Sequence, residues 1–244
     1  MPGIFIARGM DIRIPPEGLL LSMGSDGQLD GSLTIHLRFD VCATWIELAL
    51  RHLDDARAKR KSREAAWAGT DEAAKGSTLE REFEASMQAM TAAATAIEAF
   101  YSVLRTEVAL PPSIVQAWRN NRTARYSQVT EVVRRALGIK QGIASVRGYL
   151  KEIYRFRDLA VHPPGKIQVP IHHPELDVGV EWRFAYFRAG NAELIVNAAT
   201  WLIWELVHHG KPKTKGIAAY VAPLKERLRE AFPDGHPFEQ NSNG

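Results

Sequence analysis

The chain has 244 residues, of which 45% are hydrophobic and 24% are charged, a composition typical of a globular protein with one sizeable core. Its single cysteine, Cys42, excludes an internal disulfide framework and a cysteine-rich zinc site. The first residues lack the basic and apolar segments of a secretory signal. The longest apolar stretch is too short to span a bilayer and is interrupted by Glu193, Asn197 and Glu205. We therefore expect a cytoplasmic protein with no membrane partner.

The net charge of +3 is distributed unevenly. Residues 117–166 contain eleven basic and three acidic side chains, a net charge of +8, so the remainder of the chain carries −5. A local positive field favours a phosphate-bearing partner such as RNA. A solvated helical face would have the same composition, and the charge alone does not separate the two interpretations.

The first 39 residues are predicted to be extended. Residues 32–39 alternate polar and apolar side chains, with the period of two that is typical of a half-buried strand. A cluster of turn-forming residues precedes them at 24–31. Residues 4–14 and 18–23 are weaker strand candidates.

From Asp40, a candidate N-cap, the pattern becomes helical and continues to residue 61. Residues 62–78 are predicted to be a polar connection or a frayed helix end. A long helix follows and ends at Pro111 and Pro112. Its apolar side chains are spaced alternately by four and three residues, which indicates a stripe that faces the core: Phe83, Met87, Met90, Ala94, Ile97, Tyr101, Leu104 and Val108.

The second half of the chain is also predicted to be mainly helical. Helices are expected around residues 127–139 and over 143–162, followed by an inserted β-hairpin at about 166–188 with period-two apolar spacing. A last core helix covers 191–210, and a peripheral helix and loose tail cover 211–244. The fold class predicted is mostly α: a four-helix bundle over residues 40–210 with a small antiparallel β appendage, in which the segment 1–39 could pair with the inserted hairpin.

The helix at 143–162 has one charged side chain where its pattern requires an apolar one. Its apolar residues are spaced alternately by three and four positions, and this spacing predicts apolar side chains next at positions 157 and 160. Ala160 fits, but position 157 is Arg157. An unpaired buried charge costs several kcal/mol, so Arg157 needs a partner: an acidic side chain, a neighbouring subunit or a bound phosphate. Glu98, beside the core stripe of the long helix, is the first acidic candidate.

His162 follows at the end of the same helix, before Pro163 and Pro164. A cationic imidazole is favourable at a helix C-terminus, which explains this residue without a function. Beside Arg157 it also suits phosphodiester chemistry. The histidine can move protons near neutral pH, and the arginine can hold and neutralise a phosphate.

Residues 157–162, Arg-Asp-Leu-Ala-Val-His, resemble the R-x4–6-H signature of the HEPN superfamily (higher eukaryotes and prokaryotes nucleotide-binding). In that family a polar residue usually follows the arginine, and Asp158 fills that place. Arg155 is also within the permitted spacing of the histidine, but Phe156 follows it. The likeness includes the helical bundle around the motif and covers roughly residues 40–210.

The resemblance implies a metal-independent endoribonuclease without a cofactor, of the kind found in toxin–antitoxin and phage-defence systems, acting as a homodimer in which two motifs form one composite site. It implies that Arg157 binds the scissile phosphate, that His162 transfers protons and that Asp158 orients one of them. An antitoxin or other partner protein is also implied. Exposed basic side chains on the same helix are expected to follow the RNA backbone: Arg147, Lys151 and Arg155.

One alternative stays open. Some HEPN proteins are non-catalytic binding or assembly modules, in which Arg157 would be a structural ion-pair residue. Toxins silenced by an adenylylating antitoxin carry a tyrosine two residues after the histidine, where this chain has Pro164, so that control is not expected. The paired histidines at 172–173 and 208–209 lack ligand spacing for a metal. Residues 132–150 only faintly resemble a helix-turn-helix.

Overall fold

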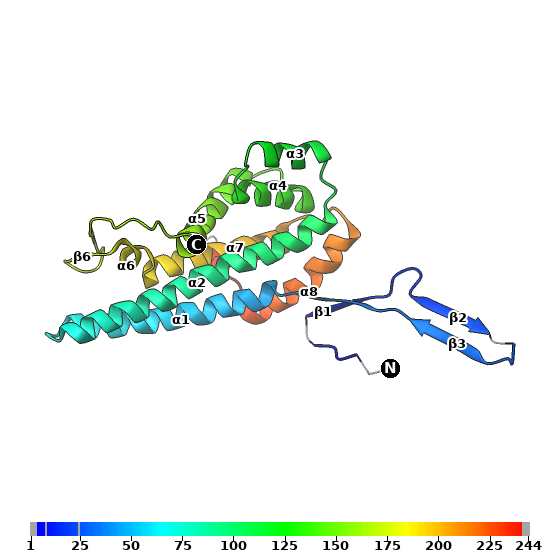
Figure 1. Cartoon of the computed structure of the whole chain (residues 1–244), viewed down its shortest axis with the longest axis horizontal. Coiled ribbons are helices and arrows are strands. Elements are labelled where there is room, and N and C mark those ends of the chain that lie inside the picture. The colour runs from blue at the N-terminus through cyan, green and yellow to red at the C-terminus, as the bar shows by residue number, and fades with distance from the viewer. Residues whose placement is uncertain (1–3, 8, 24, 241–244) are drawn as a thin grey trace. The chain divides into compact units, whose positions relative to one another are not determined.

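The computed structural model describes residues 4–7, 9–23 and 25–240, which divide into two units at the junction between Val41 and Cys42. The protein is mostly α-helical with small antiparallel β pairs, as the sequence predicts (Figure 1).

The N-terminal unit consists of two strand pairs. Strand β1 (Met10–Arg13) pairs antiparallel with β4 (His36–Phe39), and β2 (Leu19–Met23) pairs antiparallel with β3 (Leu29–Leu33). The single strand predicted at 32–39 is divided: residues 32–33 end β3, residues 36–39 form β4, and the two strands belong to different pairs. Both weaker strand candidates contain a strand. Within the described residues these strands pair only with one another.

The expected hairpin at 166–188 is much smaller than predicted, and the expectation of one shared sheet is wrong. Strand β5 (Ile171–His172) pairs with β6 (Gly179–Val180) alone. Residues Trp182–Tyr186, predicted to continue the strand, form the short helix α6. The side chain of Glu181 caps this helix by accepting from the Arg183 N–H at 2.9 Å, a local signal that outweighs the period-two pattern.

Helices α1 (Cys42–Trp67) and α2 (Glu72–Glu107) run side by side as an antiparallel hairpin (Figure 1). The predicted polar connection at 62–78 is therefore wrong, because only residues 68–71 are non-helical. Asp71 sets the start of α2, since its side chain accepts from the N–H groups of Ala73 and Ala74.

Helix α2 is the centre of the bundle and packs against the other long helices. These are α4 (Arg125–Leu137), α5 (Ile143–Val161) and α7 (Ala189–His209), and α3 (Pro112–Asn120) connects α2 to α4. The middle of the predicted stripe is buried: Met90, Ala94, Ile97, Tyr101 and Leu104.

The C-terminal region is part of the core, which corrects its description as peripheral. Helix α8 (Lys215–Ala231) buries Ile217, Tyr220 and Leu224 against α7, α1 and α2. The segment before α9 (Pro237–Gln240) was predicted to be loose, but His236 in it is fully buried. Residues 241–244 of the predicted tail lie outside the described residues.

Candidate functional site

Arg157 lies near the end of α5, beside the middle of α2. Its Nη1 donates to Oε1 of Glu98 at 3.0 Å, and its Nε and Nη2 donate to Oδ1 of Asp158 at 3.0 and 2.7 Å. Glu98 also accepts from Nε and Nη2 of Arg125, the first residue of α4, at 2.7 to 3.1 Å. One carboxylate therefore joins guanidinium groups from two helices. The Arg157 side chain is 27% exposed, so it is half-buried rather than enclosed in the core.

The surroundings of this cluster stabilise the charge on Glu98. Burial alone would raise the pKa of its carboxyl, but the hydrogen bonds and positive charges of its neighbours, Arg125 first, hold that pKa below its ordinary value. Each guanidinium also covers an aromatic ring: Arg125 lies 4.1 Å from the centroid of Tyr101, and Arg157 lies 4.7 Å from that of Tyr154. The buried Tyr154 hydroxyl has no hydrogen-bond partner of ordinary geometry within the described residues, and burial and the Glu98 charge raise its pKa.

His162 caps the C-terminus of α5, where its backbone N–H donates to the carbonyl oxygen of Asp158 at 2.8 Å. Its side chain is exposed. Within the described residues, no hydrogen bond or ion pair joins its ring to Arg157 or Asp158. The structure therefore links Arg157, Asp158 and Glu98 directly, and it leaves the imidazole open to solvent at the end of the same helix.

The three basic residues expected to follow RNA are all exposed on α5. Arg147 points toward α4, where its Cζ lies 5.7 Å from the ring centroid of Tyr126. Arg155 pairs with Glu152 at 2.8 Å and lies at the rim of a largely apolar groove of about 600 Å³ between α5 and α7. Glu152 thus offsets part of the positive field at Arg155, whereas Lys151 has no acidic partner among the described residues.

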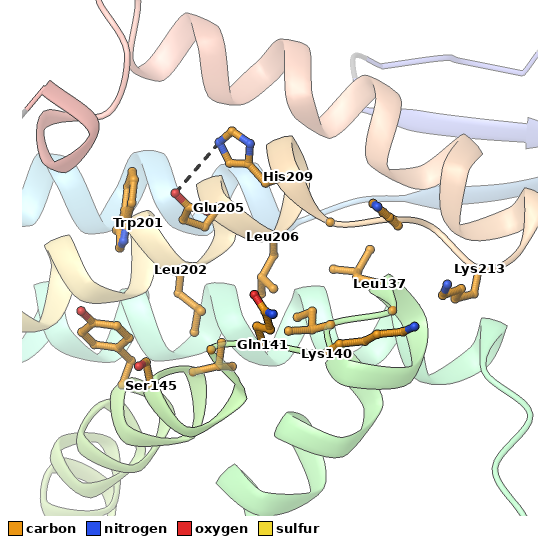
Figure 2. A pocket seen from close by; sticks show the side chains of 17 residues that line it. Leu137, Lys140, Gln141, Ser145, Trp201, Leu202, Glu205, Leu206, His209 and Lys213 are labelled. Atoms are coloured by element: carbon orange, nitrogen blue, oxygen red, sulfur yellow. Dashed lines mark ion pairs between the residues drawn. The ribbon is translucent and has the colours of Figure 1, made fainter. Parts of the chain in front are cut away.

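A larger cavity, of about 860 Å³, lies between the α4–α5 connection, the first turns of α5 and the last turns of α7 (Figure 2). Its lining combines the aromatic side chains Tyr149 and Trp201 with basic ones: Lys140, Lys211 and Lys213. The loop after α7 is fastened to the end of α4, because the N–H of Lys211 donates to the carbonyl of Leu137 at 2.8 Å. The sequence did not predict this cavity, since its two lysine-bearing loops meet only in the folded chain.

A buried ion-pair network joins α1, α2 and the start of α7. Arg63 of α1 is 1% exposed and bonds both Glu82 of α2 and Glu175, the latter at 2.5 Å. Glu82 also accepts from the N–H of Ala189, the first residue of α7, at 2.9 Å, and Glu175 accepts from Arg188 at 2.5 Å. Sequence reasoning missed this network because it placed Arg63 in a polar connection. A helical pattern carried through 62–67 would have put it on the buried face.

The paired histidines do not form a metal cluster. His172, the last residue of β5, is exposed, whereas His173, the residue that follows the strand, is fully buried. His173 accepts from the N–H of Glu175 at 3.1 Å, and burial, with the nearby charge of Arg63, lowers the pKa of its imidazole. Across the described ranges, no three histidine, cysteine, aspartate or glutamate side chains converge as metal ligands.

No helix in the same ranges has the length and apolarity needed to cross a membrane.

Comparisons with family models, curated proteins and solved structures return no match for this chain.

Proposed function

We propose that this chain is a HEPN-like, metal-independent endoribonuclease. One observation carries the proposal: Arg157 is held in a fixed, half-exposed position by Glu98 and Asp158, near the end of the helix that terminates at the exposed His162. A guanidinium that is already held in place can stabilise the negative charge on a phosphate without first rearranging. An exposed imidazole can exchange protons with substrate near neutral pH.

In the proposed reaction the 2′-hydroxyl of RNA attacks the adjacent phosphorus, and the bond to the 5′-oxygen of the next nucleotide breaks. His162 removes the proton from the hydroxyl or supplies one to the leaving oxygen, and Arg157 stabilises the charge on the phosphate. Because no hydrogen bond or ion pair joins the ring of His162 to Arg157 among the described residues, we propose that a second copy completes the site. Exposed Arg147, Lys151 and Arg155 would hold the RNA backbone. A toxin or phage-defence setting, with an antitoxin-type partner, belongs to the same proposal.

The test is incubation of the purified chain with structured and unstructured RNA, with and without EDTA. We expect cleavage in both conditions, products that carry cyclic phosphate ends, and no cleavage of DNA or of RNA methylated at the 2′-oxygen. Intact RNA under all conditions would contradict the proposal.

A second candidate function, a non-catalytic binding or assembly module, is favoured by a different reading of the same contacts. Nη1 of Arg157 already donates to Glu98, and Nε and Nη2 already donate to Asp158, as in a purely structural ion pair. In that case Arg157 should matter for stability and leave RNA affinity unchanged. Binding of labelled RNA by wild type and by Arg157→Lys would separate the two candidates, because a phosphate clamp depends on the guanidinium fork.

A further inference from the structure

The cavity of about 860 Å³ between α5 and α7 has the size of a small-molecule site. It lies wholly within the helical unit, where the α4–α5 connection and the first turns of α5 meet the last turns of α7 (Figure 2). Ser145, which lines it, is about 25 Å along α5 from His162 at the rise of an ideal helix. The cavity is therefore separate from the site that contains Arg157 and His162.

One end of this cavity carries positive charge that no acidic side chain neutralises. Its lining includes three exposed lysines, Lys140, Lys211 and Lys213, none of which forms an ion pair within the described residues. The acidic side chain in the same lining is Glu205, whose Oε1 lies 4.0 Å from Nε2 of His209. Three ammonium groups thus face one carboxylate, which favours an anion as the occupant.

The backbone brings the two lysine-bearing loops together. The N–H of Lys211 donates to the carbonyl of Leu137 at 2.8 Å, and the N–H of Lys213 donates to that of Ala136 at 2.9 Å. The side chain of Lys213 crosses directly over Gly138, whose φ of +63° ends α4, and a Cβ at this glycine would collide with Cε of the lysine. The cluster of lysines is therefore built by tertiary contacts of the loops.

The other end of the cavity carries two aromatic rings. Tyr149 of α5 is 42% exposed, and Trp201 of α7 is half-buried with its ring 5.2 Å from that of His236 and 6.2 Å from that of Phe238. In Figure 2, Trp201 lies on the left, whereas Lys140 and Lys213 lie on the right. Both rings are about two helical turns or more from the lysine-bearing loops, a separation of about 10 Å.

The helix ends beside the cavity do not decide the sign of its field. The N-terminus of α5 has no side-chain cap and no acidic residue in its first turn, so it contributes positive potential. The C-terminus of α7 ends at the same cavity and contributes negative potential. The lysines therefore determine the preference for an anion.

We infer that this lysine-lined cavity binds a phosphate ester that carries a planar ring, the chemistry of a nucleotide. The phosphate would lie against the ammonium groups, and the ring would stack on Tyr149 and Trp201. A nucleotide can reach both ends of the cavity at once, whereas inorganic phosphate or a free nucleoside can occupy only one. The inference does not depend on the proposed ribonuclease reaction, because it uses neither Arg157 nor His162.

The first test is calorimetric titration of the full-length chain with each of the four common 5′-mononucleotides, with their parent nucleosides, and with inorganic phosphate. We expect one-to-one binding of at least one mononucleotide with a dissociation constant below about 1 mM. Its nucleoside and inorganic phosphate should each bind at least about tenfold more weakly. Failure of all four mononucleotides to bind, or equal affinity for the best of them and for inorganic phosphate or the nucleoside, would overturn the inference.

Variants of the lining place the ligand. Lys140→Gln with Lys213→Gln should raise the dissociation constant about tenfold or more, because it removes two of the three cations. The matched control is Lys61→Gln with Lys166→Gln, which removes the same charge at exposed positions outside the cavity and should change affinity by less than about twofold. Tyr149→Leu should weaken binding by about fivefold or more through lost stacking. Circular dichroism checks that each variant keeps its helices, and equal affinities in the cavity variant and the control would overturn the inference.

Two further arms separate this site from the proposed catalytic one and identify the source of the nucleotide. His162→Ala should bind the mononucleotide as wild type does, and loss of binding in that variant would place the ligand elsewhere and overturn the inference. A short 2′-O-methylated RNA, which cannot be cleaved by attack of a 2′-hydroxyl, is titrated in parallel. Tighter binding of this RNA, weakened by Lys140→Gln with Lys213→Gln, would support a nucleotide within an RNA chain as the ligand. Binding no tighter than that of the mononucleotide would support a free nucleotide.

Discussion

Arg157 of α5 donates a hydrogen bond from Nη1 to Oε1 of Glu98 on α2 at 3.0 Å, across 59 residues of sequence. Through Glu98 it is connected to Arg125 of α4, so one carboxylate fixes the relative position of three helices. Arg157 is therefore part of the bundle's structure as well as a candidate phosphate ligand. Stability and activity must be measured together in any variant of this cluster.

Glu98→Gln should destabilise the fold by about 1–3 kcal/mol, because it leaves two half-buried guanidinium groups without their shared negative charge. Urea unfolding at pH 7 measures this. The matched control is Glu152→Gln, which removes an exposed ion pair with Arg155 and should change stability by less than about 1 kcal/mol. Equal losses in the two variants would mean that the Glu98 contacts contribute no more than a surface pair.

The effect of Glu98 should disappear in acid. Its pKa in the folded chain is lowered, so its contribution is complete above the unfolded pKa and is lost as pH falls through the folded one. Wild type and Glu98→Gln should therefore approach equal stability below about pH 4. A stability difference between wild type and Glu98→Gln that grows as pH falls would contradict the direction of the pKa shift.

Arg157→Ala should destabilise the fold by about 1–3 kcal/mol, less than a fully buried charge would require, because the side chain is 27% exposed. Arg147→Ala, on the exposed face of the same helix, should leave the melting temperature nearly unchanged. Differential scanning calorimetry compares the two. Identical melting temperatures would contradict the assignment of faces on α5.

Arg63→Met should cost about 3–5 kcal/mol, since it strands the buried carboxylate of Glu82. Arg60→Met is the matched control: it lies one turn away on α1, is 38% exposed and contacts Glu175 at 3.2 Å. Its loss should be below about 1 kcal/mol. Chemical unfolding of both variants tests whether the α1–α2–α7 junction depends on the buried network.

The buried His236 should make stability depend on pH between about 4 and 6.5. Burial lowers the pKa of its imidazole to about 4, so the unfolded chain takes up a proton that the folded chain excludes. Its contribution is complete above the unfolded pKa and is lost as pH falls, by about 2 kcal/mol at pH 5. His236→Leu should flatten this dependence, and His172→Gln, at an exposed position, should not. The free energy of unfolding of wild type and both variants, measured at pH 7.5 and at pH 5, tests this.

RNA binding should weaken steeply with salt, because basic side chains in residues 117–166 would act by releasing counterions. Lys151→Ala should reduce the slope of the log association constant against log salt concentration by about 1, the contribution of one phosphate contact. Titration of labelled RNA at several salt concentrations measures this. A flat response in wild type would indicate that the basic segment is only a solvated helical face.

The helices could be predicted where apolar spacing was regular, and the pairing of Arg157 could be anticipated for the same reason. A charged residue at a position where the three-and-four spacing calls for an apolar one needs a partner. Glu98 lies beside the core-facing stripe of the long helix and was the first candidate. Helix α6 could not be predicted from periodicity, because Val178, Val180 and Trp182 alternate as a strand would, whereas the Glu181 cap decides the local structure.

Long-range features were the least accessible from the sequence. The role of Arg125 in the Glu98 cluster depends on where α4 begins relative to α2, which no local pattern specifies. The same applies to the lysine-lined cavity, whose loops are brought together by backbone bonds between residues 136–137 and 211–213. The apolar alternation of β4 was visible, but only the register showed which residues of its partner strand share that face.

The central claim is that His162 performs proton transfer on RNA, and the most direct measurement compares wild type with His162→Ala on one defined RNA in EDTA. We expect the variant to have an unchanged melting temperature, within about 1 kcal/mol of stability, since the side chain is exposed at a helix end. We expect the cleavage rate constant to fall by about 10²–10⁴-fold. Equal cleavage by wild type and variant, at matched purity, would contradict the account.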